Sequence, residues 1–553
     1  MPVQVSYPGV YVREIPSGLH TITGVATSIC AFVGAAPRGA VNVPSEIFSF
    51  ADYESLFGGL VLDAAGNPGT LGFAVRDFFL NGGSDAIVVR VEGGGGKAAS
   101  VVLGGTVAVL SLEAASNGTW GNDLWAQADT MLVRDPANAT LFNLTILEFS
   151  NDQVVARERF QNLSTSPTDP KYVVGFLAAN SGLVRAAKAP VGNFGAKALF
   201  SAPAPVPPVA PAGGGGAVAV PPPPPAPAKP TDGFARFAPG VDGAPTATDV
   251  IGDPDLKTGM FALDGVDLFN MLVLPPIAPI AKAADLSQIV SQATEYCKSR
   301  RAIYIMDPPE SWFAAWSNPS TAVAAITADL TTLHGASSGY SAVYFPRVLE
   351  PNPLKKFQIE TFSPSGAIAG IYARTDVARG VWKAPAGLEA VFNGVFALSN
   401  AINNAENGKL NEIGVNCLRT FPLAGNVVWG ARTMDGADVL ESEDKYVPVR
   451  RFSLFLEESL FRGTQWVVFE PNAEPLWSQI RLNVGAFMHE LFRQGAFAGV
   501  TPQQAYFVQC DASTTTQNDI NNGIVNILVG FAPLKPAEFV ILEIQQIAGQ
   551  VAV

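Results

Sequence analysis

Hydrophobic and polar positions repeat with different periods along the chain, and these periods predict a mixture of helices and strands. Residues 71–80 have the spacing of a helix, which we expect to end at Asn81-Gly82-Gly83. The apolar, β-branched run 86–91 then predicts a buried strand. A helix, a stop and a strand in this order favour an α/β fold.

The same kind of pattern returns after residue 260. It predicts a strand at 266–274, a helix at 283–298 and a strand at 302–306, an order typical of a β-α-β unit. Further on, 474–494 is predicted as an amphipathic helix with one buried face. Its apolar positions are Leu476, Trp477, Ile480, Val484, Phe487, Met488 and Leu491.

Both ends of the chain are strand-like. Val3 to Ile15 is a strand-prone segment with a bend at Pro8-Gly9, and 539–545 is another apolar run. Left as free edges, such segments would promote aggregation, so each needs a partner strand. A strand of ten residues reaches about 33 Å, far enough to pair within its own subunit or with the sheet of a neighbour.

The stretch 93–250 differs in composition from its surroundings. It opens with the glycines 93–96, and twelve of the thirty residues in 201–230 are proline. Such a tract cannot form a core and is typical of a stiff tether or an exposed excursion. We therefore expect a β-rich inserted domain followed by a Pro/Gly-rich loop.

Composition and charge narrow the function classes. A chain of 553 residues is long enough for several domains. Only 15% of its residues are charged, against roughly 25% in ordinary soluble domains. This indicates that much surface is buried, internally or against neighbouring molecules. The net charge of −13 disfavours direct binding of nucleic acid.

The four cysteines predict neither disulfides nor a zinc site. Cys30, Cys297, Cys417 and Cys510 lie far apart and form no C-x-x-C pair, so we expect isolated reduced thiols and synthesis in the cytoplasm. The first residues lack the pattern of a secretory signal. The most apolar window, Ala98 to Leu112, is interrupted by glycine and is shorter than the ~20 residues of a spanning helix, so no membrane insertion is expected.

Few residues of the sequence are candidates for a catalytic or ligand-binding role. Asp307 ends a predicted strand where α/β enzymes place functional groups, but no second group converges on it, and we favour a helix cap or turn before Pro308. The three histidines are scattered. A phosphate loop at Gly93–Lys97 fails because Val91 and Ala98 stand where glycine and Ser/Thr are required. We predict no catalytic residue, no cofactor and no metal.

Several long stretches resemble the contractile tail sheath protein family. In the second half of the chain they are SGAIAGIYARTDVARGVWKAPAG (365–387), NVVWGARTM (426–434), YVPVRRFSLFLEESLFRGTQWVVFEPNAEPLWSQIR (446–481) and APLKPAEFVILEIQQ (532–546). In the first part they are PGVYVREIPSG (8–18), FADYESLFGG (50–59), FFLNGGSDAIVVRV (78–91) and GTWGNDL (118–124). Residues 135–255 carry no recognised similarity.

The resemblance implies a core α/β domain assembled from N- and C-terminal parts, an inserted β-rich domain on the outer surface, and terminal arms that add strands to sheets of adjacent subunits. The expected division is 1–20 (N-terminal arm), 21–92 (first part of the core), 93–250 (insert, with its loop at 201–230), 251–365 (α/β domain), 366–535 (C-terminal core domain) and 536–553 (C-terminal arm). The residues expected in the exchanged strands are Val5, Tyr7, Val10, Tyr11, Val12, Ile15, Phe539, Val540, Ile541, Leu542, Ile544 and Ile547.

The function implied is that of a structural subunit which polymerises around an inner tube and contracts to drive the tube through a target envelope. The partners implied are further copies of the chain in stacked rings, an inner tube protein, and baseplate and terminator or cap proteins. The particle would be a phage tail or a phage-tail-like particle, such as a bacteriocin or an extracellular injection system.

Three points stay open at this stage. Arg481, His489 and Arg493, on the polar face of the 474–494 helix, are expected to contact the inner tube, although a solvated helix face explains them almost as well. The alternatives to a sheath are an α/β enzyme with a site near Asp307 and a surface-displayed adhesin or surface-layer protein.

Overall fold

The computed structural model describes residues 20–63, 65–104, 109–150, 153–192, 233–276, 283–316 and 318–543. Several sequence predictions lie outside these ranges: the N-terminal strand residues Val5 to Ile15, the loop 201–230, and Ile544 and Ile547 of the C-terminal strand.

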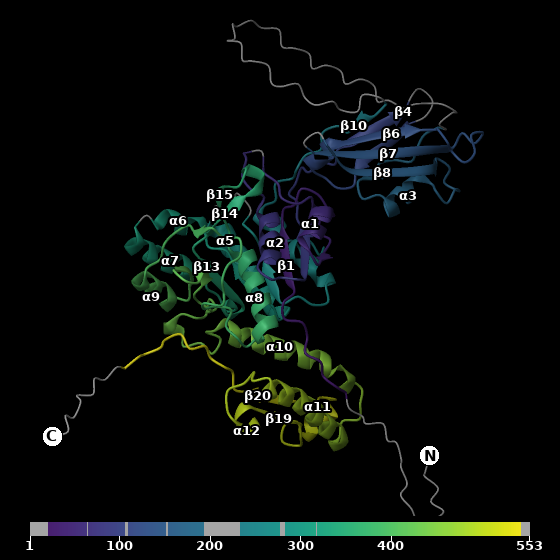
Figure 1. Ribbon diagram of the computed structural model, residues 1–553. Helices are drawn as coiled ribbons and strands as arrows, with labels where there is room; N and C mark the ends of the chain where they lie inside the picture. The colour runs from purple at the N-terminus through teal and green to yellow at the C-terminus, as the bar shows by residue number, and fades with distance from the viewer. Residues whose placement is uncertain are drawn as a thin grey trace, which may run out of the picture.

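An eight-stranded sheet forms the centre of the molecule (Figure 1). Its strands, in spatial order, are β18 (Gly425–Val428), β17 (Asn416–Phe421), β13 (Ser341–Phe345), β12 (Ile303–Met306), β11 (Met271–Val273), β1 (Cys30–Gly34), β3 (Ala86–Arg90) and β2 (Ser45–Ile47). The six inner strands run parallel, and only the edge strands β2 and β18 pair antiparallel. Strands from the first 90 residues thus pair directly with strands from the second half of the chain.

Both faces of the central sheet are covered, which explains why its strands read as continuous apolar runs. Successive residues of one strand enter different cores: Cys30 and Phe32 face one side, and Ala31 and Val33 face the other. The helices over the first side are α1 (Phe50–Phe57), α2 (Thr70–Leu80) and α8 (Ser365–Arg379). Those over the second side are α4 (Ala247–Ile251), α5 (Ala283–Ser299), α6 (Glu310–Ala315), α7 (Pro319–Leu333) and α9 (Asn404–Glu412).

Most sequence-predicted elements of this core are confirmed. Helices α2 and α5 and strands β3 and β12 lie within a residue of their predicted bounds. The strand predicted at 266–274 is shorter, because pairing with β1 begins only at Cys30↔Met271. One residue earlier, the side chain of Asn270 accepts a hydrogen bond from the Ile29 amide (3.0 Å) and ends the ladder.

A small sheet stands beside the core and is tied to it by one arginine. Its strands are β14 (Val348–Asn352), β15 (Gln358–Phe362) and β16 (Ala397–Leu398). Arg76 of α2 pairs with both Asp77 and Glu350, and Phe73 stacks on Phe362 with ring centroids 4.4 Å apart. The sheet is therefore fixed to the first side of the core.

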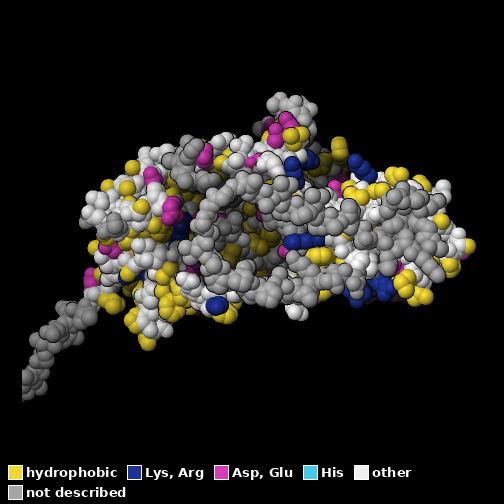
Figure 2. Space-filling model, turned by 90° about the horizontal axis from the view of Figure 1, so that it is seen from above, with side chains coloured by type: hydrophobic (Ala, Val, Ile, Leu, Met, Phe, Trp, Pro, Cys, Tyr) yellow, Lys and Arg dark blue, Asp and Glu magenta, His cyan; other side chains and the backbone are white. Residues whose placement is uncertain are grey.

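A β-sandwich with its own apolar core projects from the central domain (Figure 1). One sheet has the order β4 (Ser100–Gly104), β5 (Val109–Ala114), β9 (Val184–Ala186), and the other β10 (Ala235–Arg236), β6 (Leu124–Asp129), β7 (Leu141–Ser150), β8 (Gln153–Ser164), with α3 (Val173–Asn180) beside it. On the face visible from above, lysine and arginine are scattered in small groups rather than gathered into one basic field (Figure 2). We call this sandwich the insert.

Two arginines join the insert to the core. Arg90 is 2% exposed and donates to the carbonyl oxygens of Ala36 (2.8 Å), Gly39 (2.8 Å) and Asn117 (3.0 Å). Arg38 forms a bidentate pair with Glu148 of β7 (3.0 and 3.1 Å). These hydrogen bonds connect residues on both sides of the joint and favour one arrangement of insert and core.

A C-terminal unit lies at the end of the core opposite the insert (Figure 1). Its elements are α10 (Val447–Gly463), α11 (Glu474–Arg493), α12 (Pro502–Ala505), β19 (Tyr506–Gln509), α13 (Gln517–Asn521) and β20 (Leu528–Phe531). The seven apolar positions predicted for the buried face of α11 are all buried. The buried pair Arg451–Asp376 (2.8 and 2.6 Å) ties α10 to α8.

The predicted fold class is therefore confirmed: a mixed α/β core is assembled from early and late segments, with a β-rich insert between them. The residue boundaries predicted for the domains stay a prediction. Among the helices that the structure describes, none is both long and apolar enough to cross a bilayer.

The contact between α2 and α8 depends on two glycines. A Cβ added at Gly366 or Gly370 of α8 would overlap the carbonyl oxygen of Ala74 or Phe78 on α2. We predict that Gly370→Ala lowers the free energy of unfolding by about 1–3 kcal/mol, because the two helices must separate. The matched control is Gly408→Ala in the exposed helix α9, where nothing lies within 4 Å of the added Cβ. It should stabilise by up to about 1 kcal/mol. Urea unfolding of the two variants measures both effects, and equal stabilities would contradict this packing.

Candidate functional site

Asp307, the one residue for which the sequence left an enzyme reading open, is a helix cap. It is 8% exposed and lies at the carboxyl end of β12. Its two oxygens accept from the backbone amide (3.0 Å) and the hydroxyl (2.7 Å) of Ser365, the first residue of α8. The carboxyl thus caps a helix, as the sequence favoured, but this helix is α8, which begins 58 residues later. Burial raises its pKa to about 6.

The other groups that could carry chemistry have structural surroundings. All four cysteines are free and buried, as the sequence predicted. Burial raises the pKa of the Cys30, Cys297, Cys417 and Cys510 thiols, which keeps them protonated and unreactive. Within the described ranges, no three His, Cys, Asp or Glu side chains come close enough to share a metal ion.

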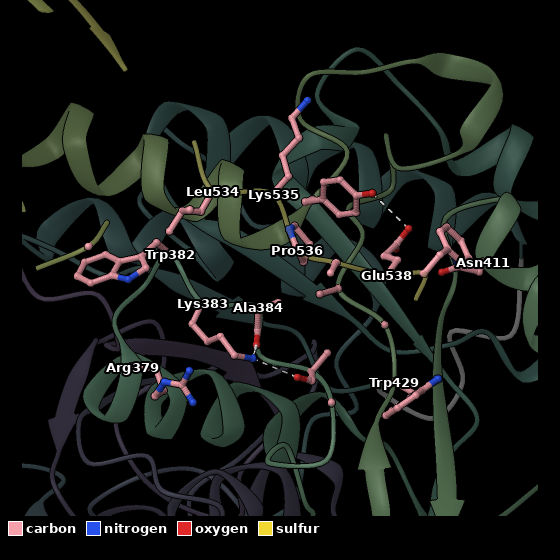
Figure 3. A pocket seen from close by; sticks show the side chains of 18 of the residues that line it. Arg379, Trp382, Lys383, Ala384, Asn411, Trp429, Leu534, Lys535, Pro536 and Glu538 are labelled. Carbon is pink, nitrogen blue, oxygen red and sulfur yellow. Dashed lines mark hydrogen bonds between the residues drawn. The ribbon is translucent and has the colours of Figure 1, made fainter. Parts of the chain in front are cut away.

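A different kind of site lies where the C-terminal segment leaves the body of the molecule. After β20, Pro533 bridges to Phe497, and the Ala498 amide donates to the carbonyl oxygen of Ala532 (2.9 Å). Residues 534–538 then cross a cavity of about 740 Å³. Figure 3 shows this segment between Trp382 and Trp429, with the Lys535 side chain pointing away from the cavity. The segment is thus packed against its own subunit as far as residue 538.

Glu538 is held there by Arg432, whose side chain is 0% exposed. The carboxylate takes two hydrogen bonds from the guanidinium, from Nε (2.8 Å) and from Nη2 (2.6 Å), and a third from the Tyr446 hydroxyl (3.2 Å). The remaining arginine nitrogen, Nη1, donates to Asp438 (2.8 Å) and to the carbonyl oxygens of Asn411 (2.8 Å) and Gly436 (3.1 Å). We call Arg432, Glu538 and Tyr446 the clasp.

Immediately beyond the clasp, the chain becomes largely exposed, although Phe539 still lines the cavity. Phe539, Val540, Ile541 and Leu542 are 74%, 79%, 84% and 82% exposed. The strand predicted from Phe539 is not formed in 539–543, the part of it that the structure describes. Among the described residues, no strand or backbone group pairs with it. Pairing of this segment with a neighbouring subunit stays a prediction.

The N-terminal segment reaches the same C-terminal unit from another side (Figure 1). Thr27 accepts a hydrogen bond from Arg451 (2.8 Å), Ile22 is buried among residues of α10 and α11, and His20 stacks on Trp466 with ring centroids 4.1 Å apart. Both terminal segments therefore run along the C-terminal unit before the described residues end.

The C-terminal unit also contains a small sheet with free edges. Strands β19 and β20 pair antiparallel from Tyr506↔Phe531 to Gln509↔Leu528, and the part of the chain that the structure describes adds no further strand to them. Their inner side packs on α10 and α11, while Phe507 and Leu528 on the outer side are half-exposed. A two-stranded sheet is marginal by itself.

The three residues predicted to touch an inner tube have different surroundings. Arg481 donates to the Cys510 carbonyl at the end of β19 and pairs with Glu474 (2.6 Å). The Arg493 side chain is 70% exposed and makes only a long contact with Glu490 (3.4 Å). His489 lies beside Phe492, with ring centroids 6.1 Å apart. His489 and Arg493 are therefore exposed, whereas Arg481 is held by contacts within its own subunit, and the tube contact stays a prediction.

Sequence reasoning did not find the clasp. The only signal was a single carboxylate in the apolar run Ala537-Glu538-Phe539-Val540, because an isolated charge inside a strand-like segment needs a partner. Its partner is 106 residues away in sequence, so no local pattern could identify Arg432.

Comparison with known proteins agrees with this arrangement. A model of the phage tail sheath protein central domain matches residues 249–434, and a model of the phage tail sheath C-terminal domain matches residues 442–547. The two matches together cover more than half of the chain. A search of curated proteins found no match.

Solved structures show the same fold. The helical sheath of the anti-feeding prophage in its contracted state is 23% identical, with a TM-score of 0.54, and the match covers 98% of this chain and 99% of that one. The sheath complex of the extracellular contractile injection system PVC, also contracted, is 20% identical with a TM-score of 0.54 and 99% coverage of both chains. A sheath tail protein from Listeria innocua is 13% identical with a TM-score of 0.56, over 93% and 96% of the two chains.

The burial of the Asp307 carboxyl predicts that stability depends on pH. Its pKa is about 6 in the folded chain and about 3.9 when unfolded, so the folded state holds the proton more tightly. Its contribution to stability is present below pH ~4 and is lost as the pH rises to ~6, by about 3 kcal/mol. In Asp307→Asn this loss should disappear. Urea unfolding between pH 4 and 7 measures it against the exposed control Asp255→Asn, and parallel curves for wild type and Asp307→Asn would contradict it.

Proposed function

The chain belongs to the phage tail sheath protein family, and from this we propose that it polymerises around an inner tube and contracts to drive the tube through a target envelope. As a member of this family, the chain is a structural sheath subunit. The sequence predicted the same family and the same class of function. It is not an enzyme, and the enzyme alternative at Asp307 is therefore wrong. We also propose that its partners are an inner tube protein and baseplate and cap proteins, in a phage tail or a phage-tail-like particle.

The observation that carries the proposal is the exposed segment Phe539–Leu542. Four consecutive large apolar side chains in water, with their backbone groups unpaired in their own subunit, are a hazard unless another chain covers them. The composition fits, since a chain with only 15% charged residues has surface to bury against copies of itself. We infer that the segment adds as a strand to a neighbouring subunit.

The sheet of β19 and β20 is the acceptor that this proposal needs. Its edges are open among the described residues, and strand addition to an open edge gives affinity through main-chain hydrogen bonds. The addition would also stabilise the small sheet, since three or more strands are needed for a stable sheet in water. The N-terminal segment, which passes Trp466 on the same unit, is the second candidate donor.

Contraction would then follow from a difference between two lattices. An extended lattice is held by contacts with the tube, whereas a shorter and wider lattice buries more surface between subunits, and release of the tube contacts allows the second to form. Exchanged strands keep neighbours connected while the bodies move. The particle would be a phage tail or a phage-tail-like particle, with baseplate and cap proteins at its ends.

Proline substitutions test strand exchange without disturbing the folded subunit. Successive amides of a strand point to opposite sides, so at least one of Val540→Pro and Ile541→Pro must remove a ladder hydrogen bond. Because both residues are about four-fifths exposed, the monomer should unfold as in wild type. We expect at least one variant to abolish tubes in electron micrographs of the purified protein. The controls Val540→Thr and Ile541→Thr keep strand propensity and should form tubes. Normal tubes from both proline variants would refute the exchange, and wild-type protein that forms no tubes at high concentration would refute the function itself.

Arg493 tests the tube contact. Charge reversal in Arg493→Glu should reduce co-assembly with the inner tube protein into extended particles, since a charge at a docking surface controls association. Arg481 is unsuitable, because its hydrogen bond to Cys510 supports β19. Arg157→Glu on the exposed face of the insert is the control, carrying the same charge change far from α11. Extended particles of normal yield and length from Arg493→Glu would remove this residue from the proposed contact.

A further inference from the structure

We propose that the clasp is the fixed root of the C-terminal arm: Arg432 positions Glu538 so that the arm leaves each subunit at one place and in one direction, ready for capture by a neighbour. This inference rests on the proposed function. It adds the residues that position the arm.

Every nitrogen of the Arg432 guanidinium has an acceptor oxygen. The Arg432 side chain is 0% exposed, and its guanidinium has five acceptor oxygens: both from Glu538, one from Asp438 and the carbonyls of Asn411 and Gly436. Asn416 adds a further constraint, because its side chain bonds both the amide (2.7 Å) and the carbonyl (2.7 Å) of residue 432. The arginine therefore has no alternative position, and it fixes the carboxylate that it binds.

Exposure to solvent changes abruptly along the C-terminal arm after Glu538. Upstream, residues 532–538 contact their own subunit through Phe497, the cavity wall and the clasp. Downstream, the four residues from Phe539 are 74–84% exposed. Glu538 is therefore the boundary between the part of the arm that belongs to its own subunit and the part available to another.

A contracting lattice would exert force on the exchanged arm. When neighbouring bodies move apart, the tension in an exchanged strand passes to the first point where that strand is fixed to its own subunit. A buried, bidentate, charge-assisted pair is the strongest polar contact available at that point, and leaving its arginine unpaired is costly. The clasp meets this requirement, whereas the packing of Lys535 and Pro536 at the cavity does not.

The test compares two substitutions that each remove one carboxylate from Arg432. Glu538→Gln weakens the clasp, and Asp438→Asn removes the other carboxylate while leaving the arm bonded. We expect Glu538→Gln to raise the critical protein concentration for tube formation about ten- to a hundredfold. Asp438→Asn should change this concentration by no more than about twofold, although it destabilises the same arginine.

The surface variant Glu443→Gln controls for loss of one negative charge on the same loop. If Glu538→Gln does not fold, Tyr446→Phe replaces it, since that variant removes only the 3.2 Å hydrogen bond and should raise the critical concentration severalfold. Equal effects of Glu538→Gln and Asp438→Asn, or wild-type assembly in Glu538→Gln, would overturn the inference. Both outcomes presuppose wild-type tubes, so they are distinguishable from failure of the proposed function, in which wild type forms none.

Discussion

The backbone groups of a β-strand must find hydrogen-bond partners, and the exposed segment Phe539–Leu542 has none among the residues that the structure describes. This constraint connects the features of the C-terminal unit. It explains why a two-stranded sheet with open edges occurs beside two departing terminal segments. It also explains why a long, weakly charged chain carries apolar side chains where an ordinary soluble protein places lysine or glutamate. We propose that neighbouring subunits complete this one.

Three buried arginines stand at the joints between distant segments. Arg90 joins the core to the insert, Arg451 joins α10 to α8 and to the N-terminal segment, and Arg432 holds the C-terminal segment. Each is at most 4% exposed, and each uses its planar fork to bind carbonyls or a carboxylate in fixed directions. Although the chain has a net charge of −13, these three positively charged side chains lie inside the fold and not on a basic surface. They divide the molecule into parts that are rigid in themselves and firmly connected.

The sequence predicted the elements whose signal is local. Helix α11 and its seven buried positions, the helix α2 followed by β3, and the β-α-β order around α5 all follow from periodicity and stop residues. The strand at 266–274 was predicted too long. Its first residue is set by the hydrogen bond between Asn270 and Ile29, which lie in different parts of the chain. Asp307 was assigned to a cap, but the helix that it caps begins 58 residues later. The clasp was missed for the same reason: partners separated by a hundred residues leave no spacing to read. Resemblance to a family supplied what local patterns could not, namely the prediction that the ends of the chain are shared between subunits.

The joint between core and insert has a mechanical consequence. Arg90 and Arg38 fix it, and Gly118 in GTWGNDL allows close approach, since a Cβ there would lie 2.7 Å from the Pro37 carbonyl oxygen. If the subunit turns as one body, a point far from the pivot traces a longer arc than a point near it. The displacement at the β7–β8 hairpin would then exceed the displacement of the central β-sheet.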